Sequence, residues 1–143
     1  YFLDQVDKTR RTYAAGQDLK LGFLLRDVRD VYVVPVHRSA PNFIGSGRFE
    51  GQVVLLDARS PVSTDLFGKI VCIENADPGF DWIFTKGVAG LITKYGGANS
   101  HMAIRCAEFG LPAAIGCGEQ AFRRVTSTHA VLLDCDNKYL RHL

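Results

Sequence analysis

The stretch from Gly96 to Gly110, GGANSHMAIRCAEFG, predicts a glycine loop that leads directly into a short helix. Ser100 is a favoured N-cap residue, and Gly110, which is followed two residues later by a proline, is a strong helix stop. We therefore expect a helix that begins at His101, with this histidine in its first turn.

Helical spacing separates the polar and apolar side chains of this segment. His101, Arg105 and Glu108 share one narrow polar stripe. Apolar side chains fill the remaining surface: Met102, Ala103, Ile104, Cys106, Ala107 and Phe109. The pattern predicts a mostly buried helix with His101 at its exposed end. Arg105 is expected to pair either with a phosphate near His101 or with Glu108.

The first turn of a helix suits a phosphoryl group, because it offers unpaired N–H groups and a partial positive charge. The same field disfavours an imidazolium, so His101 should keep a nucleophilic ring nitrogen. Gly96 and Gly97 allow close backbone approach or a positive φ. Thr93 is expected to hold this loop or to bond the His101 ring, and Ser100 to cap the helix, to touch the phosphate or to do both. The other histidines lack a helix-start context and are not expected to accept phosphate: His37, His129 and His142.

The longer run from Gly90 to Gly116, GLITKYGGANSHMAIRCAEFGLPAAIG, resembles the signature of the swivelling phosphohistidine domain of the phosphoenolpyruvate (PEP)-utilising enzymes. This family includes PEP synthase, pyruvate phosphate dikinase, enzyme I of the sugar phosphotransferase system and rifampin phosphotransferase. Matching positions extend upstream to Lys69–Glu74 and downstream to Val131–Asp134. One position departs from the signature, because its usual arginine is Ala107 here and the nearest arginine is Arg105.

The resemblance implies an α/β fold, namely a swivelling β/β/α phosphohistidine domain with a mostly parallel or mixed central sheet. It also implies that His101 is phosphorylated from ATP or PEP and passes the phosphoryl group to an acceptor such as pyruvate. The implied partners are an ATP-grasp nucleotide-binding domain, which would bring Mg²⁺ and ATP, and an acceptor-binding domain of the parent chain. No cofactor is expected in this domain itself, and the isolated domain is not expected to turn over substrate.

Two alternatives stay open beside this reading. One is a carrier domain for a different acceptor, such as an antibiotic hydroxyl, in the manner of rifampin phosphotransferase. The other is a noncatalytic docking or regulatory module of the same fold, which the missing arginine suggests.

Composition narrows the remaining classes of function. The chain has 143 residues, a length that suffices for one α/β core but not for a nucleotide site and a substrate site as well. Its formal net charge is only +2. The basic residues are dispersed, so nucleic-acid binding is not expected. No segment has the pattern of a membrane span or a signal peptide, which predicts a cytoplasmic protein without a membrane partner. The four cysteines form no C-x-x-C pair and should be buried, reduced thiols. None of the carboxylates that could serve a metal or acid–base chemistry has the spacing of a metal ligand: Asp57, Asp65, Glu74, Asp77, Asp81 and Glu108.

The order of elements predicts one α/β domain after an N-terminal arm. Apolar, β-branched runs predict strands at Val53–Leu56, Ile70–Ile73, Val88–Thr93, Ala113–Ile115 and Val131–Leu133. Helices are expected at Gly79–Lys86, Ser100–Phe109 and Glu119–Val125. Residues 1–41 are predicted to form a helical arm or linker and residues 42–143 the phosphohistidine domain, with a turn-rich loop over Ser39–Gly51 between arm and core. Phe80 and Trp82 should either anchor a partner domain or close the core beneath the sheet.

Overall fold

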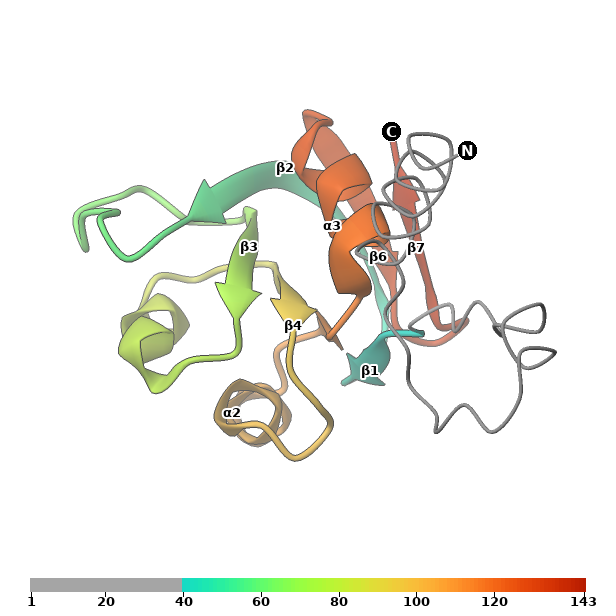
Figure 1. Ribbon diagram of the computed structural model, residues 1–143, viewed down its shortest axis with the longest axis horizontal. Helices are drawn as coiled ribbons and strands as arrows, with labels where there is room; N and C mark the ends of the chain where they lie inside the picture. Colours follow the sequence, from blue (N-terminus) through green and yellow to red (C-terminus); the bar gives the residue numbers. More distant parts are fainter. Residues whose placement is uncertain (1–39) are drawn as a thin grey trace, which may run out of the picture. The chain divides into compact units, whose positions relative to one another are not determined.

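The structure, a computed structural model, describes residues 40–143, which form an α/β fold around one mixed sheet (Figure 1). Within this range the strands are β1 (Asn42–Ile44), β2 (Arg48–Leu56), β3 (Ile70–Asn75), β4 (Gly90–Tyr95), β5 (Ala113–Ile115), β6 (Ala130–Asp134) and β7 (Tyr139–His142). The helices are the 3₁₀-helix η2 (Pro78–Thr85) and the α-helices α2 (His101–Phe109) and α3 (Gly118–Thr126). The arm predicted for residues 1–41 lies, up to residue 39, outside the described residues, and its boundary stays a prediction.

The seven described strands lie in the order β1-β5-β4-β3-β2-β6-β7. Strands β2, β3, β4 and β5 run parallel to one another, whereas β1, β6 and β7 pair antiparallel with their neighbours. Strand β2 belongs to both the parallel and the antiparallel part of the sheet. Its second half, Val53–Leu56, pairs with β3, and its first half, Arg48–Gln52, pairs with β6. The predicted α/β class with a mixed sheet is therefore confirmed.

Alternating side chains of the parallel strands make two apolar layers, one on each face of the sheet. Val71 and Ile73 face η2 and α2, where they pack with Met102. Ile70 and Cys72 project to the opposite face and join a second cluster that includes residues of α3. Phe80 and Trp82 pack against the first cluster. Of the two expectations for these residues, the one in which they close the core therefore matches their position.

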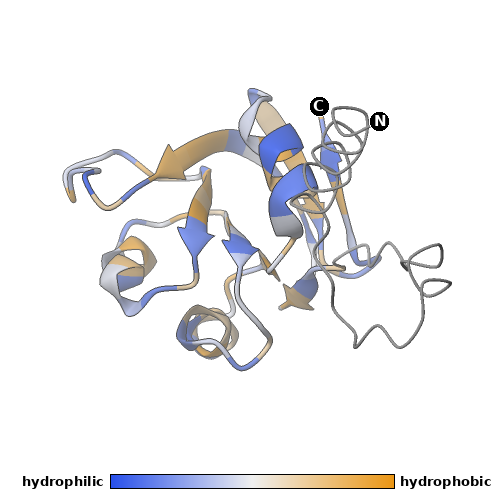
Figure 2. Ribbon diagram, in the orientation of Figure 1, coloured by the Kyte–Doolittle hydropathy of each residue, from blue (hydrophilic) through white to orange (hydrophobic). Residues whose placement is uncertain are grey.

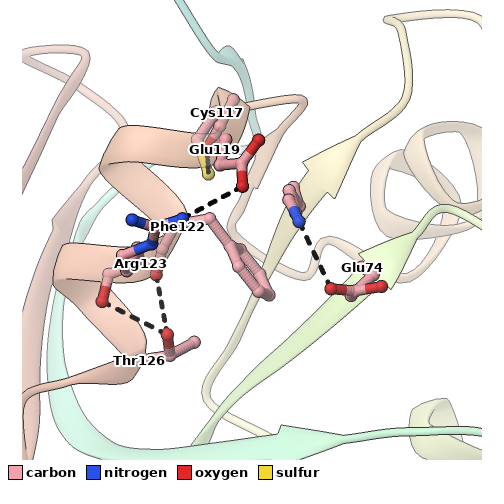
Figure 3. A network of polar contacts seen from close by, with 8 residues as sticks. Glu74, Cys117, Glu119, Phe122, Arg123 and Thr126 are labelled. Atoms are coloured by element: carbon pink, nitrogen blue, oxygen red, sulfur yellow. Dashed lines mark hydrogen bonds and ion pairs between the residues drawn. The ribbon is translucent and has the colours of Figure 1, made fainter.

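Helix α3 is strongly two-sided. Phe122 and Val125 are buried against the sheet, and Figure 3 shows the Phe122 ring between α3 and the strands. The outer surface is polar: Arg123 bonds Glu119 at 3.1 Å, and most of the helix is hydrophilic in Figure 2. Such a distribution is typical of a helix that covers one sheet face and leaves the other side to solvent.

Two edge strands were not expected from the sequence. The prediction of a turn-rich loop over Ser39–Gly51 is wrong, because β1 and the first residues of β2 lie inside it. Strand β1 has only three residues and is held by pairing with β5. The first half of β2 alternates exposed and half-buried residues, so it lacks the apolar run that marks a buried strand. Strand β7, which pairs with β6, also has no apolar run.

All four cysteines are buried and none forms a disulfide, as predicted. Burial raises the pKa of the Cys106 thiol to about 12 and that of Cys117 to about 11, and it raises the pKa of Cys72 and Cys135 as well. The thiolate is the reactive form of cysteine, so these side chains act as packing groups near neutral pH. Among residues 40–143, no helix is long and apolar enough to cross a membrane.

Candidate functional site

The histidine selected by the sequence begins helix α2, as expected. Ser100 has extended backbone angles and its hydroxyl accepts a hydrogen bond from the Ala103 N–H at 3.4 Å, so it caps the helix. Gly110 ends the helix in the left-handed region, with φ of 65°. The His101 side chain is 40% exposed, which leaves the ring accessible at the end of the helix.

A carboxylate that the sequence did not select contacts this histidine. The Oδ1 atom of Asp81 lies 2.8 Å from Nε2 of His101, and the Asp81 side chain is 41% exposed. Asp81 belongs to η2, which packs against α2 although the two residues are twenty positions apart in sequence. Helix η2 itself is begun by Asp77, whose side chain accepts from the Gly79 N–H at 2.8 Å. No spacing rule links Asp81 to His101, because the contact depends on how the two helices pack.

Arg105 lies beside this pair and is held by several groups. Its Nη1 donates to Glu108 at 2.9 Å, and its guanidinium carbon lies 4.6 Å from the centre of the Phe109 ring. Its Nε is 3.9 Å from Oδ2 of Asp81, is buried, and has no hydrogen-bond partner among residues 40–143. Of the two expected partners, Glu108 is the one that Arg105 contacts here, and its pairing with a phosphate stays a prediction.

Thr93 holds the glycine loop and not the histidine ring. The side chain is fully buried, and its hydroxyl donates to the Tyr95 carbonyl and accepts from the Gly116 N–H, each at 2.9 Å. The Thr93 carbonyl also accepts from the Cys117 N–H at 2.9 Å. Thr93 therefore joins the end of β4 to the loop after β5.

The glycines of the loops after β4 and β5 differ in whether a side chain would fit at their positions. Gly96 has φ of 130°, and a Cβ there would lie 2.8 Å from the Cβ of Ala76. Gly116 has φ of 72°, and a Cβ there would overlap the carbonyl oxygen of Gly96. Gly97 has neither restriction, because no atom lies within 4 Å of a Cβ added to it. The close approach predicted for the loop is thus made by Gly96 and not by Gly97.

The helix surface next to His101 is more apolar and more exposed than predicted. The interpretation of α2 as mostly buried is wrong in part, since Ile104 is 50% and Phe109 57% exposed. Phe109 stacks on Phe84 of η2 with ring centroids 5.1 Å apart. The helix is only nine residues long and contacts the sheet along one side, so the residues on its other side stay in solvent.

Replacing Thr93 with valine is expected to destabilise the domain by about 2 kcal/mol, because an isosteric side chain loses two buried hydrogen bonds. Thr93→Ser keeps the hydroxyl and should cost about 1 kcal/mol for the buried methyl group. Urea unfolding of both variants measures the difference. A loss in Thr93→Val no larger than that in Thr93→Ser would mean that the two hydrogen bonds contribute no more to stability than the methyl group, and would contradict the prediction.

The chain is similar to known proteins over most of the described residues. The family profile described as "PEP-utilising enzyme, mobile domain" matches residues 67–138, which include His101, Asp81 and Arg105. The rifampicin phosphotransferase of Streptomyces sviceus is 34% identical over 102 residues, which are 70% of this chain and 11% of that protein. The phosphoenolpyruvate synthase of Neisseria meningitidis serogroup B is 31% identical over 75 residues, which are 52% of this chain and 9% of that protein. The chain thus spans about a tenth of the length of these relatives.

A solved structure supports the fold. The solution NMR structure of a UPF0107 protein superposes with a TM-score of 0.54 and 16% sequence identity, and the match covers 73% of this chain and 97% of that one. At this level of identity the likeness concerns the arrangement of strands and helices alone.

Proposed function

Because this chain belongs to the family of mobile domains of PEP-utilising enzymes, we propose that it is a phosphocarrier domain in which His101 is transiently phosphorylated. The observation that carries the proposal is the position of His101 as the exposed first residue of the capped helix α2, inside the segment that matches the family. The N-terminal end of a helix stabilises negative charge, so a phosphoryl group on this ring lies where the backbone favours it.

The carrier divides one transfer into two displacements at phosphorus. In the first, the lone pair of a ring nitrogen forms an N–P bond while the bond from phosphorus to the leaving oxygen of the donor breaks, and the leaving group takes that electron pair. In the second, an acceptor oxygen forms a bond to phosphorus and the N–P bond breaks, which returns the electron pair to the imidazole. Arg105, whose Nε lies 3.9 Å from Oδ2 of Asp81, is proposed to balance the charge of the phosphoryl group. Thr93, Gly96, Gly97 and Ser100 are proposed to shape the loop and cap beneath it.

The donor and the acceptor would bind to other domains of the parent chain. We assign ATP with Mg²⁺, bound to an ATP-grasp domain, as the donor, and PEP as the alternative donor. Pyruvate is assigned as the acceptor, bound to an acceptor-binding domain. A tether between domains makes each docking intramolecular, with effective concentrations in the millimolar range for short flexible linkers. We propose that the parent enzyme works in the cytoplasm, on the basis of these proposed substrates. The chain alone would then accept and hold phosphate without completing a turnover.

A second acceptor is favoured by one comparison. The match to the rifampicin phosphotransferase extends over 102 residues, against 75 for the phosphoenolpyruvate synthase, and is slightly higher in identity. An antibiotic hydroxyl is therefore the alternative acceptor. The carrier step on His101 is the same in both cases, so only the acceptor domain distinguishes them.

The test is phosphorus NMR at alkaline pH on the parent enzyme after it is mixed with Mg²⁺-ATP or with PEP. We expect an acid-labile phosphoramidate signal, which fragmentation mass spectrometry should map to the peptide that contains His101. Addition of pyruvate or of a rifamycin then identifies the acceptor, because only the correct one discharges the signal. A folded parent enzyme that binds ATP but gives no signal with either donor would contradict the carrier role and favour the docking module.

A further inference from the structure

The contact between Asp81 and His101 brings a carboxylate to one particular ring nitrogen. Oδ1 of Asp81 lies 2.8 Å from Nε2, the atom at the tip of the imidazole. We propose that Asp81 is a positioning residue that keeps a proton on Nε2 of unphosphorylated His101, and so prevents this nitrogen from accepting a phosphoryl group until the carboxylate moves away. The role in the carrier cycle rests on the proposed function, whereas the control of the proton rests on the contact alone.

The argument begins with what each atom can donate or accept. An ionised carboxylate only accepts hydrogen bonds, so a bond of 2.8 Å to Nε2 requires that Nε2 bears the hydrogen. A neutral imidazole has one N–H and one lone pair, and the hydrogen bond made by one nitrogen determines the tautomer. With Asp81 in place, the lone pair of the neutral ring is therefore on Nδ1. Nε2 becomes nucleophilic only after the contact breaks and the proton moves to Nδ1 or to solvent.

Charge gives a second reason why Asp81 would have to leave Nε2. A phosphoryl group on Nε2 would carry its negative oxygens to the place that the Asp81 carboxylate occupies, and like charges at that distance repel. A phosphoryl group on Nδ1 meets no such conflict, since Asp81 could keep its bond to the Nε2 proton. The carboxylate thus discriminates between the two nitrogens before any partner domain docks.

Arg105 offers the carboxylate a second position. Its Nε is buried without a hydrogen-bond partner in the described part of the chain and lies 3.9 Å from Oδ2 of Asp81. A small rotation of Asp81 toward Arg105 would break the bond to Nε2 and give Nε of Arg105 an acceptor. A buried N–H without an acceptor is costly, so this alternative position is stabilised by the bond that it forms. The two positions of Asp81 correspond to a blocked and an open Nε2.

The test uses the 143-residue chain and potassium phosphoramidate, a small donor that needs no partner domain. In this reaction a ring lone pair forms the N–P bond, the P–N bond of the reagent breaks, and ammonia leaves with a proton. Asp81→Asn keeps the shape of the side chain but offers both a donor and an acceptor, so it no longer selects one tautomer. Phosphorus and ¹H–¹⁵N NMR spectra of His101 give the ratio of the Nε2 to the Nδ1 phosphoisomer.

We expect Asp81→Asn to raise the initial ratio of Nε2 to Nδ1 phosphorylation by about tenfold, the change that corresponds to one charge-assisted hydrogen bond. Ring ¹⁵N shifts before phosphorylation should show the Nε2–H tautomer in the wild type and a mixture in the variant. Glu119→Gln is the matched control, because it removes one negative charge whose ion-pair partner is Arg123 on α3 and not Arg105. Asp81→Ala should shift the ratio in the same direction.

An unchanged ratio and tautomer in both Asp81 variants would overturn the proposal, and so would an equal rise in Glu119→Gln. This result is independent of the carrier role. If the parent enzyme is never phosphorylated on His101 but the ratio still shifts, the proposed function fails while the control by Asp81 stands. If the parent enzyme is phosphorylated and the ratio does not shift, the carrier role stands and Asp81 is not its positioning residue.

Discussion

His101→Ala in the parent enzyme is expected to remove the acid-labile phosphoryl group and to lower turnover by about a thousandfold or more, because the proposed covalent step loses its nucleophile. The change in the free energy of unfolding should stay below about 1 kcal/mol, since the side chain is 40% exposed and its replacement leaves no buried cavity. Phosphorus NMR of the labelled enzyme and urea unfolding of the domain measure the two effects separately.

The matched control for this variant is His129→Ala. His129 is exposed in the turn before β6, and its carbonyl, which accepts from the Val53 N–H at 3.0 Å, is retained in alanine. We expect full phosphorylation of this variant. A phosphoramidate that persists in His101→Ala, or one that disappears in His129→Ala, would place the carrier role on another residue.

Gly116→Ala should destabilise the domain by more than about 3 kcal/mol. A Cβ at this position would overlap the carbonyl oxygen of Gly96, and the φ of 72° is itself unfavourable for alanine. The neighbouring atoms are backbone and cannot move without disturbing the ends of β4 and β5, which Thr93 joins. Urea unfolding of the purified chain gives the loss of stability directly.

Gly110→Ala separates the two contributions to this loss. Gly110 has a similar φ of 65°, but no atom lies within 4 Å of an added Cβ. The left-handed conformation alone should cost about 1 to 2 kcal/mol there. Equal losses in the two variants would mean that the backbone around Gly116 relaxes enough to accept a methyl group, and that the loops are not rigidly joined.

Much of the fold follows from local patterns in the sequence. The strand predicted at Ala113–Ile115 is β5 to the residue, and the predicted strand at Ile70–Ile73 needs only two more residues to become β3. Both are short apolar runs buried on two faces, which is the pattern that parallel strands produce. The edge strand β1 could not be predicted in this way, because Asn42–Ile44 becomes a strand only by pairing with β5.

The candidate site divides along the same line. His101 and Ser100 could be found because a helix start depends on neighbouring residues, and the cap on α2 is formed as predicted. The sequence could not decide whether Thr93 holds the glycine loop or bonds the His101 ring. Its partner Gly116 lies in a different loop, which only the fold brings close to Thr93. Asp81 was not linked to His101 from the sequence, because their contact arises from the packing of η2 on α2, which no spacing in the sequence records.

The shared strand β2 has a consequence for synthesis of the protein on the ribosome. Its first half pairs with β6, whose last residue, Asp134, emerges long after Arg48, and β1 likewise waits for β5. Strands β2, β3 and β4 can associate earlier, but β1 and the first half of β2 keep open edges until these late partners arrive. Open strand edges are prone to pair with other chains, so the nascent domain is exposed to aggregation for most of its translation. Protease resistance should therefore appear in one late step, after Asp134 has left the exit tunnel.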